Sequence, residues 1–410
     1  MHQNLRLRRT PDWTALPAPD PRLEVSVIVP VRNEARRLRA ALRCLAGQRD
    51  ASGGPLDPGR FEVIVLANNC TDASAEIVRE FAVRMPELRL FVVEVAFPSS
   101  VAHVGHARAC LMNEACRRLT RRGHPGGVIA STDGDTRVAP DWLSATLAEV
   151  HAGADAVGGR IVMDATRADP PGLALYTRRD ADYQRLRAQL EDALDPDPAD
   201  PWPRHHQHFG ASLAITTHAY RRVGGLPAEP FLEDEALFEE MRRHDIKVRH
   251  SERVAVLTSS RRHGRVEVGL SWQLREWATL AKAGRQATVT DPVAWANDIV
   301  LRRRLRRLWM SRRAPDGRLS VLTVQRLKNL ATKLDVPERW LERRVGAGEP
   351  FGAIWSDVQA HRKPRAEQAP HVGMGQAITA LRAMLARHRQ KTRARADRAG
   401  RSRAASRSRA

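Results

Sequence analysis

Short runs of apolar, often β-branched residues alternate with amphipathic stretches over residues 23–150. Between the runs, apolar positions recur three or four residues apart, as in Leu38, Leu42 and Leu45, which predicts helices with one buried face. We expect Asn33 to cap the first of these helices. Strands that alternate with helices are typical of an α/β fold with a mostly parallel sheet and helices on both faces. The predicted strands are residues 24–31, 61–66, 88–95 and 128–130.

The pattern is less regular in the second half of the chain. Further strands are predicted at residues 155–162, 208–215 and 248–258. A polar insertion, residues 165–203, interrupts them and has a helical pattern between about residues 173 and 194. We expect a main domain preceded and followed by smaller parts. The parts are an N-terminal extension (1–22), the main domain (23–285, with halves 23–150 and 151–285), a helical extension (286–360) and a basic tail (361–410).

Residues 361–410 carry much of the formal net charge of +21, with 14 Lys or Arg against two acids. Their final part, residues 393–410, is almost entirely Arg, Ala and Ser, so we expect this tail to be largely disordered. The positive charge of the tail attracts polyanions, of which an anionic membrane is one. The alternative is that the tail only increases solubility. Because the final part has no aromatic residue for base stacking, we expect no specific nucleic-acid binding.

The hydropathy and the cysteines of the chain indicate its location in the cell. We find no apolar run of roughly 18 residues, so we expect no membrane-spanning helix. The basic N-terminus is not followed by an apolar stretch, so no secretory signal is predicted. The cysteines form no C-x-x-C pair and are typical of reduced packing residues. We expect a cytoplasmic protein, or one at the inner face of the membrane. The cysteines are Cys44, Cys70, Cys110 and Cys116.

Asp133-Gly134-Asp135 directly follows the apolar run at residues 127–130. Two carboxylates this close repel each other, and burying them unpaired is costly. A divalent cation between them would relieve both effects, and Mg²⁺ or Mn²⁺ commonly completes its shell with substrate phosphates. The pair therefore predicts a site for a metal and a diphosphate. A solvated Asp-Gly turn is the alternative.

Two further polar clusters follow predicted strands, Arg32-Asn33-Glu34 and Asn68-Asn69. In open parallel sheets, ligands bind outside the carboxyl ends of the strands. We therefore expect these clusters to converge with Asp133 and Asp135 at one edge of the sheet, where a ligand binds.

Several short motifs follow one another in a fixed order over residues 23–280. They are Val25-Ser26-Val27-Ile28-Val29-Pro30 with Asn33-Glu34, Ala67-Asn68-Asn69-Cys70-Thr71-Asp72, Gly105-His106-Ala107-Arg108, Asp133-Gly134-Asp135 and Glu233-Asp234. The series resembles family 2 glycosyltransferases of the GT-A fold, which use nucleotide sugars.

This resemblance implies a nucleotide-sugar donor and a divalent cation, Mg²⁺ or Mn²⁺, that neutralises the departing diphosphate. It makes Asp135 the metal ligand, with Asp133 binding the ribose, the metal or its water. Arg108 falls where the family often has a basic residue near the diphosphate; an exposed helix cation is the alternative. His263 is either an added metal ligand or a surface residue. The implied nucleotide-sugar-binding residues are Pro30, Val31, Asn33, Glu34, Asn68, Arg108 and Asp133.

On the acceptor side, Glu233-Asp234 matches the family's Glu-Asp pair, in which the Asp is the usual base. The acceptor hydroxyl loses a proton as it attacks the sugar, and a carboxylate can take that proton. Catalysis is therefore assigned to Asp234 and Glu233, with inversion at the anomeric carbon. A helix cap is the alternative role. Residues 208–213 resemble the small-residue strand that precedes the acceptor site.

Two positions depart from the family pattern. Ala67 stands where an Asp commonly helps to read the base, so the base stays open, although Asn68 can replace that carboxylate in part. Glu276 stands where processive members have the Arg of a Gln-x-x-Arg-Trp motif. We therefore do not expect processive polymer synthesis.

The prediction is a metal-dependent glycosyltransferase of the hexosyltransferase class that moves a single sugar to a small or lipid-linked acceptor. One alternative is a retaining cytosolic enzyme that resembles glucosyl-3-phosphoglycerate synthase, in which Asp234 is not the base. An alternative of another class is a polyanion-binding protein on an inactive GT-A scaffold, as the basic tail and Ala67 would suit. An active enzyme whose tail docks on an anionic membrane combines the two.

Overall fold

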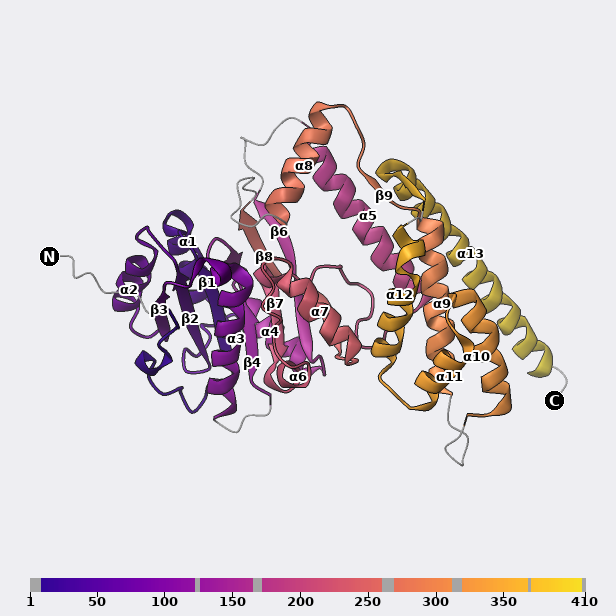
Figure 1. The fold of residues 1–410 in the computed structure, drawn as a ribbon, viewed down its shortest axis with the longest axis horizontal. Coiled ribbons are helices and arrows are strands. Elements are labelled where there is room, and N and C mark those ends of the chain that lie inside the picture. Colours follow the sequence, from indigo (N-terminus) through magenta and orange to yellow (C-terminus); the bar gives the residue numbers. More distant parts are fainter. Residues whose placement is uncertain are drawn as a thin grey trace. The chain divides into compact units, whose positions relative to one another are not determined.

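The computed structural model describes residues 9–121, 126–164, 172–259, 269–311, 319–367 and 370–407. The chain divides into two compact units, whose elements are labelled in Figure 1. The first unit comprises Met1–Asp169 and Gln207–Glu276, and the second comprises Pro170–His206 and Trp277–Ala410. The insertion predicted from the sequence thus supplies a helix to the second unit.

The first unit is built on an eight-stranded sheet with the order β3-β2-β1-β4-β7-β6-β8-β5. Strands β3, β2, β1 and β4 are parallel to one another, and β6 is parallel to β8. Strands β7 and β5 run against their neighbours. The predicted α/β class with a mostly parallel sheet is confirmed. The strands are β1 (Val25–Val31), β2 (Phe61–Asn68), β3 (Leu90–Val95), β4 (Val128–Ser131), β5 (Arg137–Val138), β6 (Ala156–Asp164), β7 (Leu213–Thr216) and β8 (Val248–Ser259).

Helices cover both faces of this sheet. Successive side chains of a strand point to opposite faces. Accordingly, Ile28 packs with residues of α3, α6 and α7, whereas Val27 and Val29 pack with residues of α1, α2 and α4. Every residue of β1 is buried, as expected for a central parallel strand. The helices are α1 (Ala35–Ala46), α2 (Ser74–Arg84), α3 (Val104–Thr120), α4 (Trp142–His151), α6 (Thr217–Arg222) and α7 (Glu233–Arg243), with short 3₁₀ helices at Trp13–Ala15, Ser99–Val101 and Gly210–Ser212.

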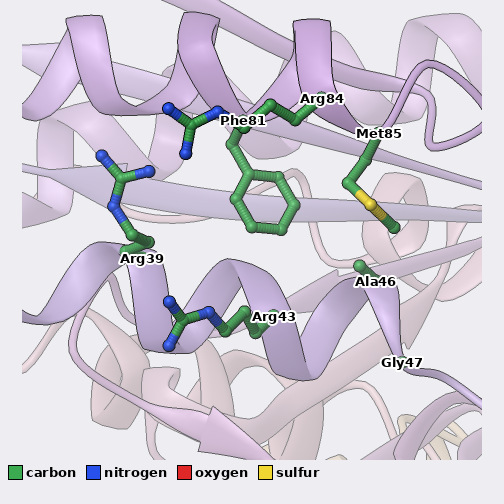
Figure 2. Close-up of a pocket in the computed structure, with 7 residues that line it drawn as sticks. All are labelled: Arg39, Arg43, Ala46, Gly47, Phe81, Arg84 and Met85. Carbon is green, nitrogen blue, oxygen red and sulfur yellow. The ribbon is translucent and has the colours of Figure 1, made fainter.

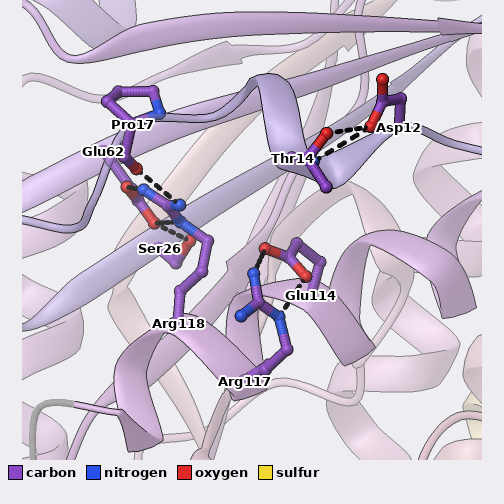
Figure 3. A network of polar contacts seen from close by, with 8 residues as sticks. All are labelled: Asp12, Thr14, Pro17, Ser26, Glu62, Glu114, Arg117 and Arg118. Carbon is purple, nitrogen blue, oxygen red and sulfur yellow. Dashed lines mark hydrogen bonds and ion pairs between the residues drawn. The ribbon is translucent and has the colours of Figure 1, made fainter.

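A buried polar network lies at the amino ends of β1 and β2 (Figure 3). Arg118 of α3 donates from Nε to Oε1 of Glu62 at 2.8 Å and from Nη2 to Oε2 at 2.6 Å. The hydroxyl of Ser26 donates to Oε1 of Glu62 at 3.0 Å. Nη1 of Arg118 donates to the Pro17 carbonyl at 2.9 Å, which ties the N-terminal segment to the domain.

In its described part, the second unit is helical apart from one small two-stranded antiparallel sheet, β9 with β10. Helix α5 packs with α9 and α13 around Leu186, Leu190 and Leu381. Helices α9 to α12 enclose a separate core that includes Leu330 and Trp355. The elements are α5 (Leu173–Leu194), α9 (Pro292–Met310), α10 (Val321–Leu334), α11 (Glu338–Gly346), α12 (Phe351–Glu367), α13 (Met374–Arg407), β9 (Thr288–Thr290) and β10 (His371–Gly373); α8 (Leu270–Lys282) spans the boundary between the units in sequence.

Helix α13 begins at Met374, within the tail that was predicted from residue 361. Its first turns bury Ala377, Ile378, Leu381 and Leu385, which recur three or four residues apart and face α5. The net charge of residues 361–410 gave no sign of this apolar stripe, because most of their Lys and Arg follow Leu385. Across the described ranges, no helix is both long enough and apolar enough to cross a membrane.

Candidate active site

The carboxyl ends of β1, β2 and β4 lie at one edge of the sheet. Val31 of β1 pairs with Ala67 of β2, and Ile28 of β1 pairs with Ser131 of β4. The three polar clusters predicted from the sequence therefore leave the sheet side by side. Pro30 and Val31 are part of β1 itself, and Asn68, 3% exposed, is the last residue of β2.

Asn33 does not cap α1 by its side chain, contrary to the sequence expectation. Its backbone is left-handed, with φ of 55°, and its Oδ1 accepts a hydrogen bond from the Thr71 backbone N–H at 2.7 Å. Asp72 accepts from the Ala35 N–H at 3.0 Å, so a carboxylate from the neighbouring loop serves the first turn of α1. Asn33 thus joins the loops after β1 and β2. Asn69 has the same left-handed backbone, with φ of 50°.

Glu34 lies against the Asp-Gly-Asp turn. A Cβ on Gly134 would be 2.9 Å from Cγ2 of Val31 and 3.3 Å from Cγ of Glu34. Only a glycine lets the turn approach the β1 loop this closely. The Glu34 backbone N–H donates to Oγ of Ser74 at 2.9 Å, which holds the loop in place. The structure therefore brings Glu34 together with the Asp133–Asp135 turn.

Arg108 connects the donor and acceptor motifs. Its Nη2 donates to Oδ1 of Asp133 at 2.6 Å, and its Nη1 donates to Oε1 of Glu233 in an ion pair. The Arg108 side chain is 5% exposed, which overturns the alternative of an exposed helix cation. Glu233 is equally buried, whereas the Asp133 side chain is 35% exposed. One buried cation therefore holds an acid from each side of the site.

Asp234 is fixed at the start of α7. Its Oδ2 accepts a hydrogen bond from the Gly210 N–H at 2.8 Å, and its Oδ1 accepts from the Glu235 N–H at 3.0 Å. The Gly210 carbonyl in turn accepts from the Ser131 hydroxyl at 2.8 Å, next to the Asp-Gly-Asp turn. Asp234 is therefore connected to the end of β4 through two hydrogen bonds.

Gly210 also packs directly on Arg108. A Cβ at position 210 would lie 2.4 Å from Cζ of Arg108, so any larger residue would displace the guanidinium group. The small residues at positions 210–212 thus accommodate a side chain of the protein. Sequence reasoning did not find this contact, because nothing in a short motif shows which helix lies over it.

The segment before α7 rests on α3. A Cβ on Gly105 would lie 1.9 Å from the Glu229 carbonyl oxygen. The Tyr220 hydroxyl donates to Oδ1 of Asn113 on α3 at 2.8 Å and accepts from the Leu226 N–H at 3.1 Å. Burial raises the pKa of Tyr220 to about 12, so this phenol stays protonated. These contacts place the start of α7 relative to Arg108.

His103 precedes α3 and caps it. Its Nδ1 accepts from the His106 N–H at 3.2 Å, which requires an unprotonated Nδ1. Burial, and next the neighbouring His106, lower the pKa of His103 below its usual range. The pattern Gly105-His106-Ala107-Arg108 gave no sign of this cap.

An aromatic cluster missed by the sequence reasoning lies beside Asp234. The His208 ring stacks on Phe238 with a centroid distance of 3.6 Å, and its Nδ1 lies 3.4 Å from Nε2 of His250. Nε2 of His208 is 3.2 Å from a carboxylate oxygen of Glu235. The cluster supports residues 208–212, the segment that contains Gly210.

The carboxylates of the Asp-Gly-Asp turn fit a hard divalent cation. Asp133 and Asp135 are both partly exposed, and Arg108 is bonded to one oxygen of Asp133. Within the described ranges, no group of three or more His, Cys, Asp or Glu gathers to enclose a metal ion. Two partly exposed carboxylates suit a cation that takes its other ligands from water and phosphates. His263 lies outside the described residues.

Comparison with known proteins finds one family that matches part of the chain. Residues 26–197 match the family described as Glycosyl transferase family 2. This segment is similar to family 2 glycosyltransferases, as the motif series predicted. The matched segment contains the Asp-Gly-Asp turn and Arg108 but ends before Glu233 and Asp234.

Individual relatives are distant. The glycosyltransferase AglE of Haloferax volcanii is 26% identical over 138 residues, which are 33% of this chain and 39% of that relative. Among solved structures, the mannosyltransferase PcManGT from Pyrobaculum calidifontis, in complex with GDP-Man and Mn²⁺, has a TM-score of 0.43 at 18% identity and covers 92% of this chain and 91% of its own. S. aureus TarS 1–349 with UDP-GlcNAc has a TM-score of 0.42 at 15% identity, covering 83% and 92%.

Proposed function

We propose that the protein transfers a single sugar from a nucleotide-diphosphate sugar to an acceptor hydroxyl, with a divalent cation and with inversion at the anomeric carbon. The observation that carries the proposal is the Arg108 bridge. It joins Asp133, at the end of the donor-side strand β4, to Glu233, at the start of the helix that bears Asp234. A transferase needs donor and acceptor groups held in one geometry, and this bridge provides it.

On the donor side, we assign Pro30, Val31, Asn33 and Glu34 to the nucleoside, together with Asn68. They lie in or next to the loop after β1, which the Asn33–Thr71 hydrogen bond holds at the sheet edge. Because Ala67 supplies no carboxylate, the identity of the base stays open. Asp135 and Asp133 would hold Mg²⁺ or Mn²⁺. When bound, such a cation offsets the charge that develops on the leaving diphosphate.

On the acceptor side, we assign the base role to Asp234. Two backbone N–H donors hold its carboxylate in place at the first turn of α7, and a carboxylate can accept the hydroxyl proton. Glu233 is ion-paired with Arg108 and buried, so it positions the start of α7 while Asp234 takes the proton. A base opposite the leaving group gives inversion.

We propose that the basic end of α13 contacts an anionic membrane, which would suit a lipid-linked acceptor. Arg387, Arg389, Lys391 and Arg393 are exposed there, after the buried Leu385. Each Lys or Arg near such a surface contributes roughly 1 kcal/mol of attraction.

The first experiment is a thermal-shift screen of nucleotide sugars with and without Mn²⁺. A ligand that binds only the folded state raises the melting temperature, so a hit identifies the donor. We expect the shift to require Mn²⁺ or Mg²⁺ and to vanish in Asp135→Ala, while the melting temperature of that variant without ligand stays unchanged. A shift that survives Asp135→Ala would contradict the assigned metal site.

Once donor and acceptor are known, two comparisons separate the alternatives. The anomeric configuration of the product, read by NMR, distinguishes inversion from the retaining alternative. Deleting residues 386–410 should leave transfer to a soluble acceptor intact, whereas Asp135→Ala should abolish it. A polyanion-binding protein on an inactive scaffold would show no transfer. Its polyanion binding would be lost on deletion of residues 386–410 and kept in Asp135→Ala.

A further inference from the structure

A hollow of about 390 Å³ lies between α1 and α2, away from the carboxyl-end edge of the sheet (Figure 2). Arg39 and Arg43 of α1 and Arg84 of α2 line it, together with Phe81 and Met85. Its volume falls in the range of small-molecule sites, roughly 300–1,000 Å³. No residue assigned to sugar transfer contributes to it.

The three arginines concentrate positive charge on one side of this hollow. Nη2 of Arg39 lies 3.0 Å and Nη2 of Arg84 lies 4.0 Å from the same oxygen of Glu80, so the two helices bring their guanidinium groups to one place. Arg43 follows Arg39 by one helical turn on the same face. Glu80 offsets one of three charges, and none of the residues that line the hollow is an acid. An anion would gain from the remaining charge.

The other side of the hollow is apolar. In Figure 2 the guanidinium groups lie to one side of the Phe81 ring, and Met85 lies to the other. Phe81 is largely buried in the core beneath the two helices, so its ring forms a fixed floor, and Met85 is only partly covered. A ligand that spans the hollow therefore meets cations at one end and apolar atoms at the other.

We propose that this hollow, the α1–α2 pocket, binds a phosphate ester that carries an apolar group. A guanidinium group binds phosphate oxygens through paired, charge-assisted hydrogen bonds, which a lysine ammonium group does not reproduce. The apolar group contacts Phe81 and Met85. Such a ligand is either a soluble phosphomonoester or the headgroup region of an anionic lipid. The site is independent of sugar transfer.

The test measures binding to the full-length protein by calorimetry, with phenyl phosphate, monomeric short-chain phosphatidic acid and inorganic phosphate. We expect phenyl phosphate or the phosphatidic acid to bind at least tenfold more tightly than inorganic phosphate. Whichever of the two binds more tightly identifies a soluble or a lipid source. Inorganic phosphate binding as tightly as both would overturn the proposal, as would no binding by any probe.

Paired variants locate the site. Arg43→Gln with Arg84→Gln should weaken binding roughly tenfold or more, because each removes a charge-assisted contact. The matched control, Arg37→Gln with Arg121→Gln, removes two exposed charges elsewhere; Arg37 lies on the opposite edge of α1 by helical periodicity. Met85→Gln should reduce the preference for phenyl phosphate over inorganic phosphate. Equal losses in the paired variant and the control would sink the proposal.

Discussion

Helix α3 carries two buried arginines that do different work at opposite ends of the sheet. Arg118, near its C-terminal end, donates from Nε and Nη2 to one carboxylate, Glu62, and from Nη1 to a carbonyl. Arg108, near its N-terminal end, holds two carboxylates from different elements, and its buried Nε has no partner among the described contacts.

The two networks differ in exposure as well as in partners. Glu62 is fully buried, so the Arg118 network is closed to ligands (Figure 3). Asp133 is 35% exposed, so the Arg108 network has one acid that a ligand can reach. A fully satisfied buried ion pair is costly to break on one side only, whereas a pair that leaves an acid open can also bind and position a substrate. The comparison teaches that burial alone does not mark a functional charge.

The largest expected effect is at the Arg108 network, which has an acid that a ligand can reach. Asp234→Asn keeps an oxygen for the Gly210 N–H but cannot take a proton, so kcat should fall roughly 10²- to 10⁴-fold. The melting temperature should stay near that of the wild type. Steady-state kinetics with the identified donor would measure this, with Glu239→Gln on the same helix as a control. Near-normal kcat in Asp234→Asn would remove its role as base.

In the Arg118 network, which is closed to ligands, the substitution Arg118→Met should lower the stability of the fold. It leaves the Glu62 carboxylate buried without its partner, which should lower the free energy of unfolding by about 3–5 kcal/mol. Denaturant unfolding measures this value. Adding Glu62→Leu should recover much of the loss, since no charge then remains buried.

The matching substitution in the Arg108 network sharpens the contrast. Arg108→Met should lower kcat/KM of the folded protein, whereas Arg118→Met should leave kcat/KM per folded molecule unchanged. If Arg118→Met reduced activity as strongly as Arg108→Met at equal folded fraction, the division between a structural and a functional arginine would be wrong.

A smaller effect is expected where α3 supports the acceptor segment. Gly105→Ala places a Cβ against the Glu229 carbonyl, so the segment before α7 must shift. Overpacking of this kind typically costs about 1–3 kcal/mol, and the displaced Asp234 should lower kcat/KM by roughly tenfold or more. Gly126→Ala is the control, because a Cβ there meets open space. Equal behaviour of the two variants would contradict the contact.

The smallest effect concerns pH. Because the pKa of His103 is lowered in the folded state, the unfolded chain binds a proton more readily as the pH falls below about 6.5. The His103 contribution to stability is therefore present above that pH and is lost as the pH falls through the folded pKa. Asn caps helices without titrating, so His103→Asn should show a slightly shallower fall in melting temperature between pH 7.5 and pH 5. An identical pH profile would contradict this.

Much of the first unit could be predicted from local patterns. The β-branched runs gave β1, β2, β3 and β4 within a few residues, and the insertion helix was predicted at the bounds that α5 has. The motif order also placed the polar clusters at one edge. Asn33 was misjudged, because a helix N-terminus can be capped from another loop, here by Asp72, and a linear pattern does not show that loop.

The sequence by itself determined the α/β class, the sheet edge that carries the polar clusters and the similarity of residues 26–197 to family 2 glycosyltransferases. These depend on hydrophobic periodicity and on residues close together along the chain. The tertiary structure alone decided that Arg108 is buried between Asp133 and Glu233, which are 100 residues apart, and that α1 and α2 bring three arginines around Phe81. Such contacts depend on how distant elements pack, and the free energy that selects them comes from burial and charge pairing in three dimensions.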